Sequence, residues 1–111
     1  IKRRNDGKSS FTDDQNHHVD HMFDLVSRAL ERMNYILTKQ TLTHNDINVS
    51  YNIENEINTY RNQLKSRDIE DINNKLYSYQ DGVYYMNVIG ECEKVGDYVL
   101  NVVQALIEKK I

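Results

Sequence analysis

The stretch VDHMFDLVSRALERMNYIL, residues 19–37, decides the fold of this chain. Its apolar residues recur at spacings of three and four, which places them in one helical stripe about 140° wide at about 100° per residue. The stripe consists of Val19, Met22, Phe23, Val26, Ala29, Leu30, Met33, Ile36 and Leu37. Thr12, followed three residues later by Gln15, predicts a capping box ahead of the stripe. We therefore expect a first amphipathic helix over residues 13–39.

Two further helical patterns follow. The segment KQTLTHND, residues 39–46, breaks the first pattern, and a second apolar period then runs through Val49, Ile53, Ile57, Tyr60 and Leu64. We expect a kink or turn near KSRD, residues 65–68, because the continuation through Ile69, Ile72 and Leu76 lies on a different face. A third helix is predicted from about Ser78 to Lys109. Its predicted buried residues are Tyr84, Val88, Cys92, Val95, Val99, Val102, Val103 and Leu106.

Three helices with short connections predict an all-α fold, an antiparallel three-helix bundle. The 111 residues fit one domain with a modest core, and the sequence contains no proline to interrupt a long helix. Residues 1–12 are charged and small and carry no apolar period. We therefore expect residues 1–12 to form a flexible linker or terminus and residues 13–111 to form the bundle.

Composition excludes several classes of protein. A formal charge of −3 gives no reason to expect a nucleic-acid partner. The single cysteine, Cys92, excludes an internal disulfide framework, and its place in an apolar stripe predicts a buried, inert thiol. No apolar run approaches the roughly 20 residues that a membrane-spanning helix needs.

The last third of the chain carries an acidic motif. Glu93, Asp97 and Asn101 follow one another at spacings of four, and Gly90 and Gly96 lie within about 60° of Glu93 on the same helix. Glycine costs about 1 kcal/mol against alanine in a helix interior, so another backbone or a bound ion is expected to come close here. The ridge is expected to face away from the main core. A cation would relieve the repulsion between Glu93 and Asp97, whereas an ordinary solvated helix face is the alternative.

The acidic motif also carries a family resemblance. The stretch ECEKVGDYVLNVV, residues 91–103, resembles the signature of the PhoU family of phosphate-transport regulators, with Glu93, Gly96, Asp97 and Asn101 matching its pattern. The segment ENEINTYRNQL, residues 54–64, resembles the family's preceding helix, with Glu56 in place and Asn58 where the family commonly has Asp. The resemblance implies a metal site at Glu93 and Asp97, with Asn101 and Glu56 as further candidate ligands. It does not distinguish Fe, Zn, Mg and Mn.

The resemblance also implies a biological context. PhoU proteins contain two three-helix repeats, and this chain is long enough for one, so pairing as a homodimer into a six-helix arrangement is expected. The stretch of residues 77–105 is most similar to the cytoplasmic tails of bacterial sodium/phosphate cotransporter proteins. A first residue Ile1 and the basic residues at positions 2–4 suit a cytoplasmic piece cut from a longer, membrane-associated chain. The transmembrane portion of that chain is then an expected partner.

A second candidate metal site lies on the first helix. His17, His21 and Asp24 fall within about 60° of one another on its polar side, and two histidines four residues apart can bind a transition metal. Solvent-facing histidines near the start of a helix are the alternative.

Two classes of function remain at the level of sequence. The first is a non-enzymatic regulatory domain in phosphate transport with a metal-binding acidic motif, and its alternative is a helical interaction or dimerisation module without metal. The second is an enzyme, for which a helical bundle needs a convergent basic pocket or paired Glu-x-x-His motifs. The sequence shows neither, so we expect no enzymatic activity.

Overall fold

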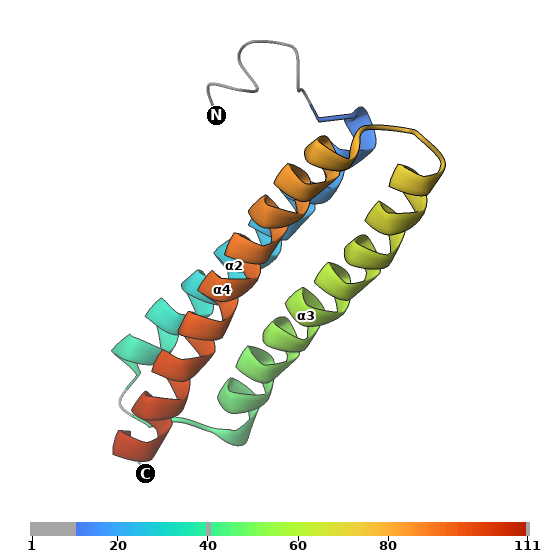
Figure 1. The fold of residues 1–111 in the computed structure, drawn as a ribbon. Coiled ribbons are helices and arrows are strands. Elements are labelled where there is room, and N and C mark those ends of the chain that lie inside the picture. The colour runs from blue at the N-terminus through green and yellow to red at the C-terminus, as the bar shows by residue number, and fades with distance from the viewer. Residues whose placement is uncertain (1–10, 40, 111) are drawn as a thin grey trace.

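The computed structural model describes residues 11–39 and 41–110, with the side chains of residues 109 and 110 left aside. Within these ranges the chain forms three helices, α2 (Asp13–Thr38), α3 (His44–Asn73) and α4 (Tyr79–Lys110), and no strand. α2 and α4 run in the same direction, and α3 runs opposite to both (Figure 1). Each helix contacts the other two. The predicted all-α three-helix bundle is confirmed.

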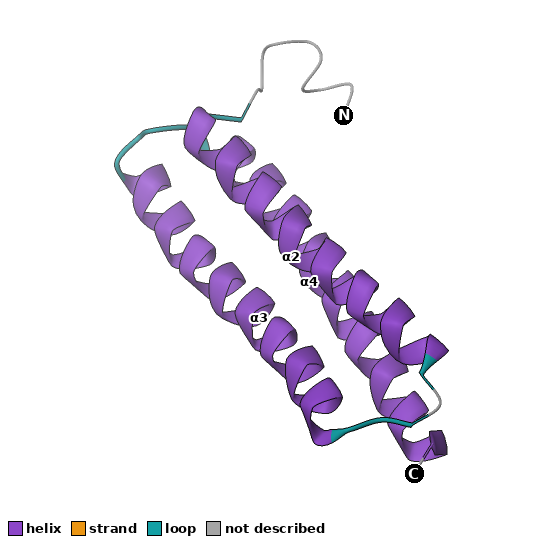
Figure 2. Cartoon of the chain, turned by 180° about the vertical axis from the view of Figure 1, so that it is seen from behind, coloured by secondary structure: helices purple, strands orange, loops and turns teal. Residues whose placement is uncertain are grey.

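The connections lie at opposite ends of the bundle, as Figure 2 shows from behind. Each of the first two helices begins with a capping box. Thr12 accepts a hydrogen bond from the backbone of Gln15 at 3.1 Å, and the Gln15 side chain accepts one from the backbone of Thr12 at 2.9 Å. Thr43 and Asp46 make the same reciprocal pair at the start of α3. These side chains satisfy N–H groups that a helix start leaves without partners, and the predicted box at Thr12 is confirmed.

α3 is continuous through residues 65–68, so the expected kink there is wrong. Asp68 is buried one turn after the buried Leu64, so the inward-facing side of α3 continues through this segment. A polar residue at a buried position hid that continuity from a search for apolar periods. Ile69, which suggested a different face, is exposed.

A left-handed residue ends α3. Lys75 has φ of 62°, and the N–H groups of Lys75 and Leu76 donate to the carbonyls of Ile72 and Asp71, both at 3.0 Å. This is the hydrogen-bond pattern of a Schellman motif, which reverses the chain toward α4.

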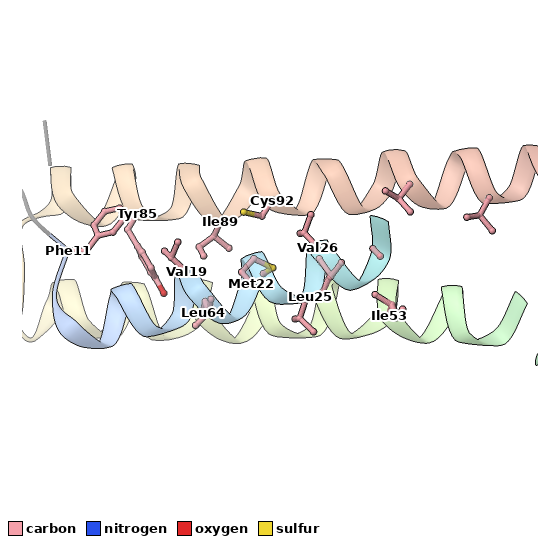
Figure 3. Packing of buried hydrophobic residues seen from close by; sticks show 14 of the residues in the cluster. Phe11, Val19, Met22, Leu25, Val26, Ile53, Leu64, Tyr85, Ile89 and Cys92 are labelled. Carbon is pink, nitrogen blue, oxygen red and sulfur yellow. The ribbon is translucent and has the colours of Figure 1, made fainter. Parts of the chain in front are cut away.

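The core contains apolar residues from all three helices (Figure 3). On α4 the buried residues include Cys92, Val99 and Val103, as predicted, but also Tyr85 and Ile89. Tyr84, Val88, Val102 and Leu106 are only partly buried. Val95 is 39% exposed, so its predicted burial is wrong. Because α4 packs against two helices, its buried side is turned toward Tyr85, Ile89 and Gly96.

Phe11 lies in the core just ahead of α2. Its ring centre is 5.5 Å from that of Tyr84 and 5.7 Å from that of Tyr85, at the start of α4. Packing therefore begins within the segment assigned above to a linker, of which residues 1–10 lie outside the described residues. No described helix is long and apolar enough to cross a membrane.

Two glycines of α4 mark close approaches to α3. A Cβ on Gly82 would lie 2.5 Å from Ile72 Cδ1, and one on Gly96 would lie 3.0 Å from Ile57 Cδ1. A Cβ on Gly90 would meet nothing within 4 Å. α3 comes close at Gly96 through the side chains of Ile57 and Glu54, not through its backbone as expected, and the expected close approach is wrong at Gly90.

We predict opposite effects of alanine at two of these glycines. Gly90→Ala should raise the free energy of unfolding by up to about 1 kcal/mol, because alanine is the better helix former and space is open there. Gly82→Ala should lower it, because the new methyl group would overlap Ile72. Urea unfolding monitored by circular dichroism measures both changes, and equal effects of the two substitutions would contradict the close approach at Gly82.

Candidate functional site

α3 buries polar side chains on the side that faces its neighbours. Four of the five buried polar or charged residues among those described belong to this helix, and they are Asp46, Ser50, Glu54 and Asp68. The first three are spaced by four residues and so lie on one side of the helix. Buried polar groups need partners, and two of these residues solve that requirement in different ways.

Asp46 is fully paired. Its Oδ1 accepts a hydrogen bond from Arg32 at 2.9 Å, and its Oδ2 accepts one from Lys39 at 2.7 Å and one from the backbone of Thr43 at 2.9 Å. The hydrogen bond from Lys39, followed by that from Thr43, lowers the pKa of Asp46 to about 2. This residue joins the end of α2 to the start of α3 and has a structural role.

Glu54 is buried without such partners. Only 6% of the surface of Glu54 is accessible to solvent. Neither of its carboxylate oxygens has a hydrogen-bond partner among the described residues. A Cβ on Gly96 would lie 3.2 Å from Glu54 Oε2, so the carboxyl group sits against the backbone of α4. Burial, followed by the neighbouring Asp97 carboxylate, raises the pKa of Glu54 to about 7. Glu93 adds to this effect, while Asn58 opposes it.

The acidic motif borders α3 at Glu93, whereas Asp97 and Asn101 are exposed, in agreement with the expectation that the ridge faces away from the main core. The Glu93 side chain is 21% exposed, and its Oε1 lies 3.3 Å from Nε of Arg61 on α3. Asp97 is exposed at the edge of the contact. Only Glu93 departs from the expectation, because a helix in a three-helix bundle has two neighbours and the glycine at position 96 lets α3 come close to the side that carries Glu93.

The further candidate ligands of the motif are not brought to this point. Glu56 lies on the side of α3 that faces α2, where its Oε1 is 3.7 Å from Nη2 of Arg28. Asn101 is exposed, one turn beyond Asp97. The Oδ1 atom of Asn58 is buried and has no hydrogen-bond partner among the described residues. The motif thus gains Glu54 from α3 in place of Glu56.

The histidine site of the first helix is solvent-facing. His17, His21 and Asp24 are all exposed. The ring of His21 stacks edge-on against Tyr60 of α3, with centres 4.6 Å apart. Within residues 11–39 and 41–110, no group of three or more His, Cys, Asp or Glu side chains is arranged to hold a metal ion. At the acidic motif the reason is visible, since Glu93 is turned toward Arg61.

Sequence reasoning missed Glu54. It follows Ile53 and precedes Ile57 by three residues, so it borders the apolar stripe of its helix. The spacing of Ser50, Glu54 and Asn58 by four was the available signal, but polar spacing alone does not separate a buried polar row from a solvated one.

A second candidate site is an apolar surface on α2 and α4. Phe23, Leu30 and Leu37 follow one another at seven-residue spacing on α2 and are 50%, 36% and 48% exposed. Val88, Val95 and Val102 have the same spacing on α4. Val95 is 39% exposed, and Val88 and Val102 are partly buried. We call these six residues the α2–α4 face.

Helix geometry places both rows away from α3. On α2, Phe23 and Leu30 lie about 80–100° to one side of the buried Met22, whereas Arg28 and Arg32, which contact α3, lie about 80–120° to the other. On α4, the valine row lies about 100–140° to one side of Ile89, opposite the Glu93 that contacts α3. The two rows therefore lie on the outer side of the contact between α2 and α4.

No protein-family model, curated protein or solved structure matches the chain. The resemblance to PhoU-type repeats stays a prediction, and the function has to be inferred from the geometry of the described residues.

Glu54 makes stability depend on pH in a predictable direction. The pKa is raised from 4.5 to about 7 in the folded protein, so the contribution of Glu54 to stability is full below pH 4.5 and is lost as the pH rises through 7. We predict that Glu54→Gln, which cannot ionise, gains stability relative to the wild type over this range. Urea unfolding at a series of pH values measures the difference.

The matched control is Glu56→Gln, which changes an exposed glutamate two residues away. Its stability should stay parallel to that of the wild type over the same pH range. A constant difference between Glu54→Gln and the wild type across the range from the ordinary pKa of 4.5 to the raised pKa of about 7 would show that the Glu54 carboxyl group is not perturbed.

Proposed function

We propose that this domain is a non-enzymatic regulatory module that binds a protein segment on its α2–α4 face. The observation that carries the proposal is the row of Phe23, Leu30 and Leu37, three large apolar side chains at heptad spacing, each at least one-third exposed. Exposed large apolar side chains aligned along one side of a helix are typical of protein-binding sites. Seven-residue spacing is the pattern by which one helix packs along another.

The resemblance to PhoU-type repeats gives the proposal its context. In this context the domain is cytoplasmic, belongs to a longer sodium/phosphate cotransporter-like chain and acts in phosphate transport or its regulation. The face would then take part in contacts with the transmembrane portion of that chain or in pairing of two copies.

A partly open cavity at the start of α2 is lined by polar groups that already pair with one another and by apolar side chains. Its volume is about 190 Å³, and its lining includes His18, Asp68, Tyr77 and Tyr85. Tyr77 donates a hydrogen bond to Asp68 at 2.7 Å, and Nδ1 of His18 is 3.0 Å from the hydroxyl of Tyr85. These groups pair with one another, as expected of a network that stabilises the bundle end.

A photo-crosslinking amino acid in place of Leu30 tests the partner-binding function in living cells. We expect a crosslinked adduct from position 30 that disappears when Phe23→Ser is added to the same chain. Ile69, which is 55% exposed on α3 and outside the face, is the matched control position and should give no adduct. The same result at positions 30 and 69 would contradict the proposal.

A second candidate function is cation binding at the acidic motif. It is favoured by the two unpartnered oxygens of Glu54 beside Asp97, because oxygen ligands without donors suit a hard cation. A third carboxylate would come from Glu93 only if it turned away from Arg61.

Elemental analysis of the purified domain after exposure to Mn²⁺ or Fe³⁺ tests this candidate. Bound metal should be present in the wild type and absent from the Glu93→Gln/Asp97→Asn variant, with Glu54→Gln reduced. Equal metal content in the wild type and the double variant would exclude the acidic motif as the ligand set, and light scattering on the same samples reports whether the domain is a dimer.

A further inference from the structure

Basic side chains are distributed unequally over the bundle. Each arginine among the described residues lies in an ion pair at a contact made by α3. The pairs are Arg28 with Glu56, Arg32 with Asp46, Arg61 with Glu93, and Arg67 with Asp14 and Asp71. The α2–α4 face has no arginine of its own.

Carboxylates border that face along α2. Asp20 and Glu31 occupy the solvent side of α2, about 60–100° around the helix from Phe23 and Leu30, and neither has an ion-pair partner in the described part of the chain. On α4 Asp81 and Lys109 stand one heptad beyond the two ends of the valine row, and Glu91 and Lys94 lie beside the row. Lys94 is paired with Glu91, with Nζ and Oε2 2.9 Å apart. The α4 border carries two charges of each sign, so the acidic excess of the face lies along α2, at Asp20 and Glu31.

The shape of the face suits one helix. α2 and α4 run in the same direction (Figure 1), and helix geometry places their two heptad rows on the same side of the bundle, away from α3. From Phe23 to Leu37 the row extends about 21 Å, at about 1.5 Å per residue. A helix of four or five turns covers this length, and its own apolar stripe would pack between the rows.

We infer that the α2–α4 face binds a single amphipathic helix whose apolar stripe is flanked by lysine or arginine. The inference rests on the proposed partner-binding function and specifies the chemistry of the partner. The helix would bury its apolar stripe against Phe23, Leu30 and Val95. Its basic flanks would lie beside Asp20 and Glu31, which lack ion-pair partners within the described chain.

Charge separates this partner from two others. A second copy of the chain would bring one acidic border against another, which costs binding energy. An anionic membrane surface would be repelled in the same way, because juxtamembrane attraction requires basic groups. A basic helix would instead be attracted to the carboxylates that repel a second copy of the chain and an anionic membrane.

The test uses three synthetic peptides of about 21 residues, long enough for three heptads. The first has leucine at the heptad core positions and lysine on the flanks, the second replaces the lysines with glutamates, and the third is a scrambled form of the first without an apolar stripe. Fluorescence anisotropy measures the dissociation constant of each peptide for the intact 111-residue chain, at low and at high salt.

We expect the lysine-flanked peptide to bind at least about tenfold more tightly than the other two, with an affinity that falls as salt screens the charges. Leu30→Gln should abolish this binding. Asp20→Asn/Glu31→Gln should weaken it toward that of the glutamate-flanked peptide. Ile69→Gln, the same kind of apolar-to-polar change outside the face, should leave the binding unchanged. Circular dichroism should show that all variants remain folded.

Three results overturn the inference. Equal binding of the lysine- and glutamate-flanked peptides through Leu30 would refute the basic partner and leave the partner-binding function standing. A dimer in light scattering that Leu30→Gln dissociates, and that the lysine-flanked peptide does not displace, would identify a second copy as the occupant. Binding of no peptide by a monomeric domain would refute the inference, and the crosslinking result at position 30 then decides the function separately.

Discussion

The burial of polar side chains along α3 is the constraint on which the rest of the structure depends. A carboxylate that leaves water must be paired or must lose its charge. Asp46 follows the first course through Arg32, Lys39 and Thr43, and Glu54 follows the second through a raised pKa. α3 therefore uses arginines of α2 and of its own sequence to hold its place, and close packing at Gly96 excludes water from Glu54.

This constraint divides the molecule into two kinds of helix contact. The contacts of α3 are polar at their edges and bordered by ion pairs, whereas the outer side of the α2–α4 contact is apolar and bordered by carboxylates. Because the arginines of the described chain are used at the first kind of contact, none of them neutralises Asp20 and Glu31, which border the second. The need of α3 for arginine partners thus influences the surface charge beside the α2–α4 face.

The sequence predicted the fold because the apolar period of residues 19–37 is strong and the chain contains no proline. It predicted the approach of a neighbour at Gly96 but not which neighbour, since helix periodicity reports burial without naming the partner helix. It missed Glu54 and the continuity of α3 at Asp68 for one reason: both are charged residues at buried positions, which an apolar pattern records as gaps. The sequence assigned Val95 to the core because the apolar stripe of α4 does not show which of its residues contact α2, which contact α3 and which remain exposed.

Phe11 gives the bundle a mechanical property. Its ring is held by Tyr84 and Tyr85, so the chain enters the structure at the end where α4 begins, and α4 leaves at the opposite end (Figure 1). Tension applied between the two ends of the domain therefore acts along the helix axes. Extension under this load requires α2 and α4 to slide past each other, breaking many contacts together, and does not peel them apart one turn at a time.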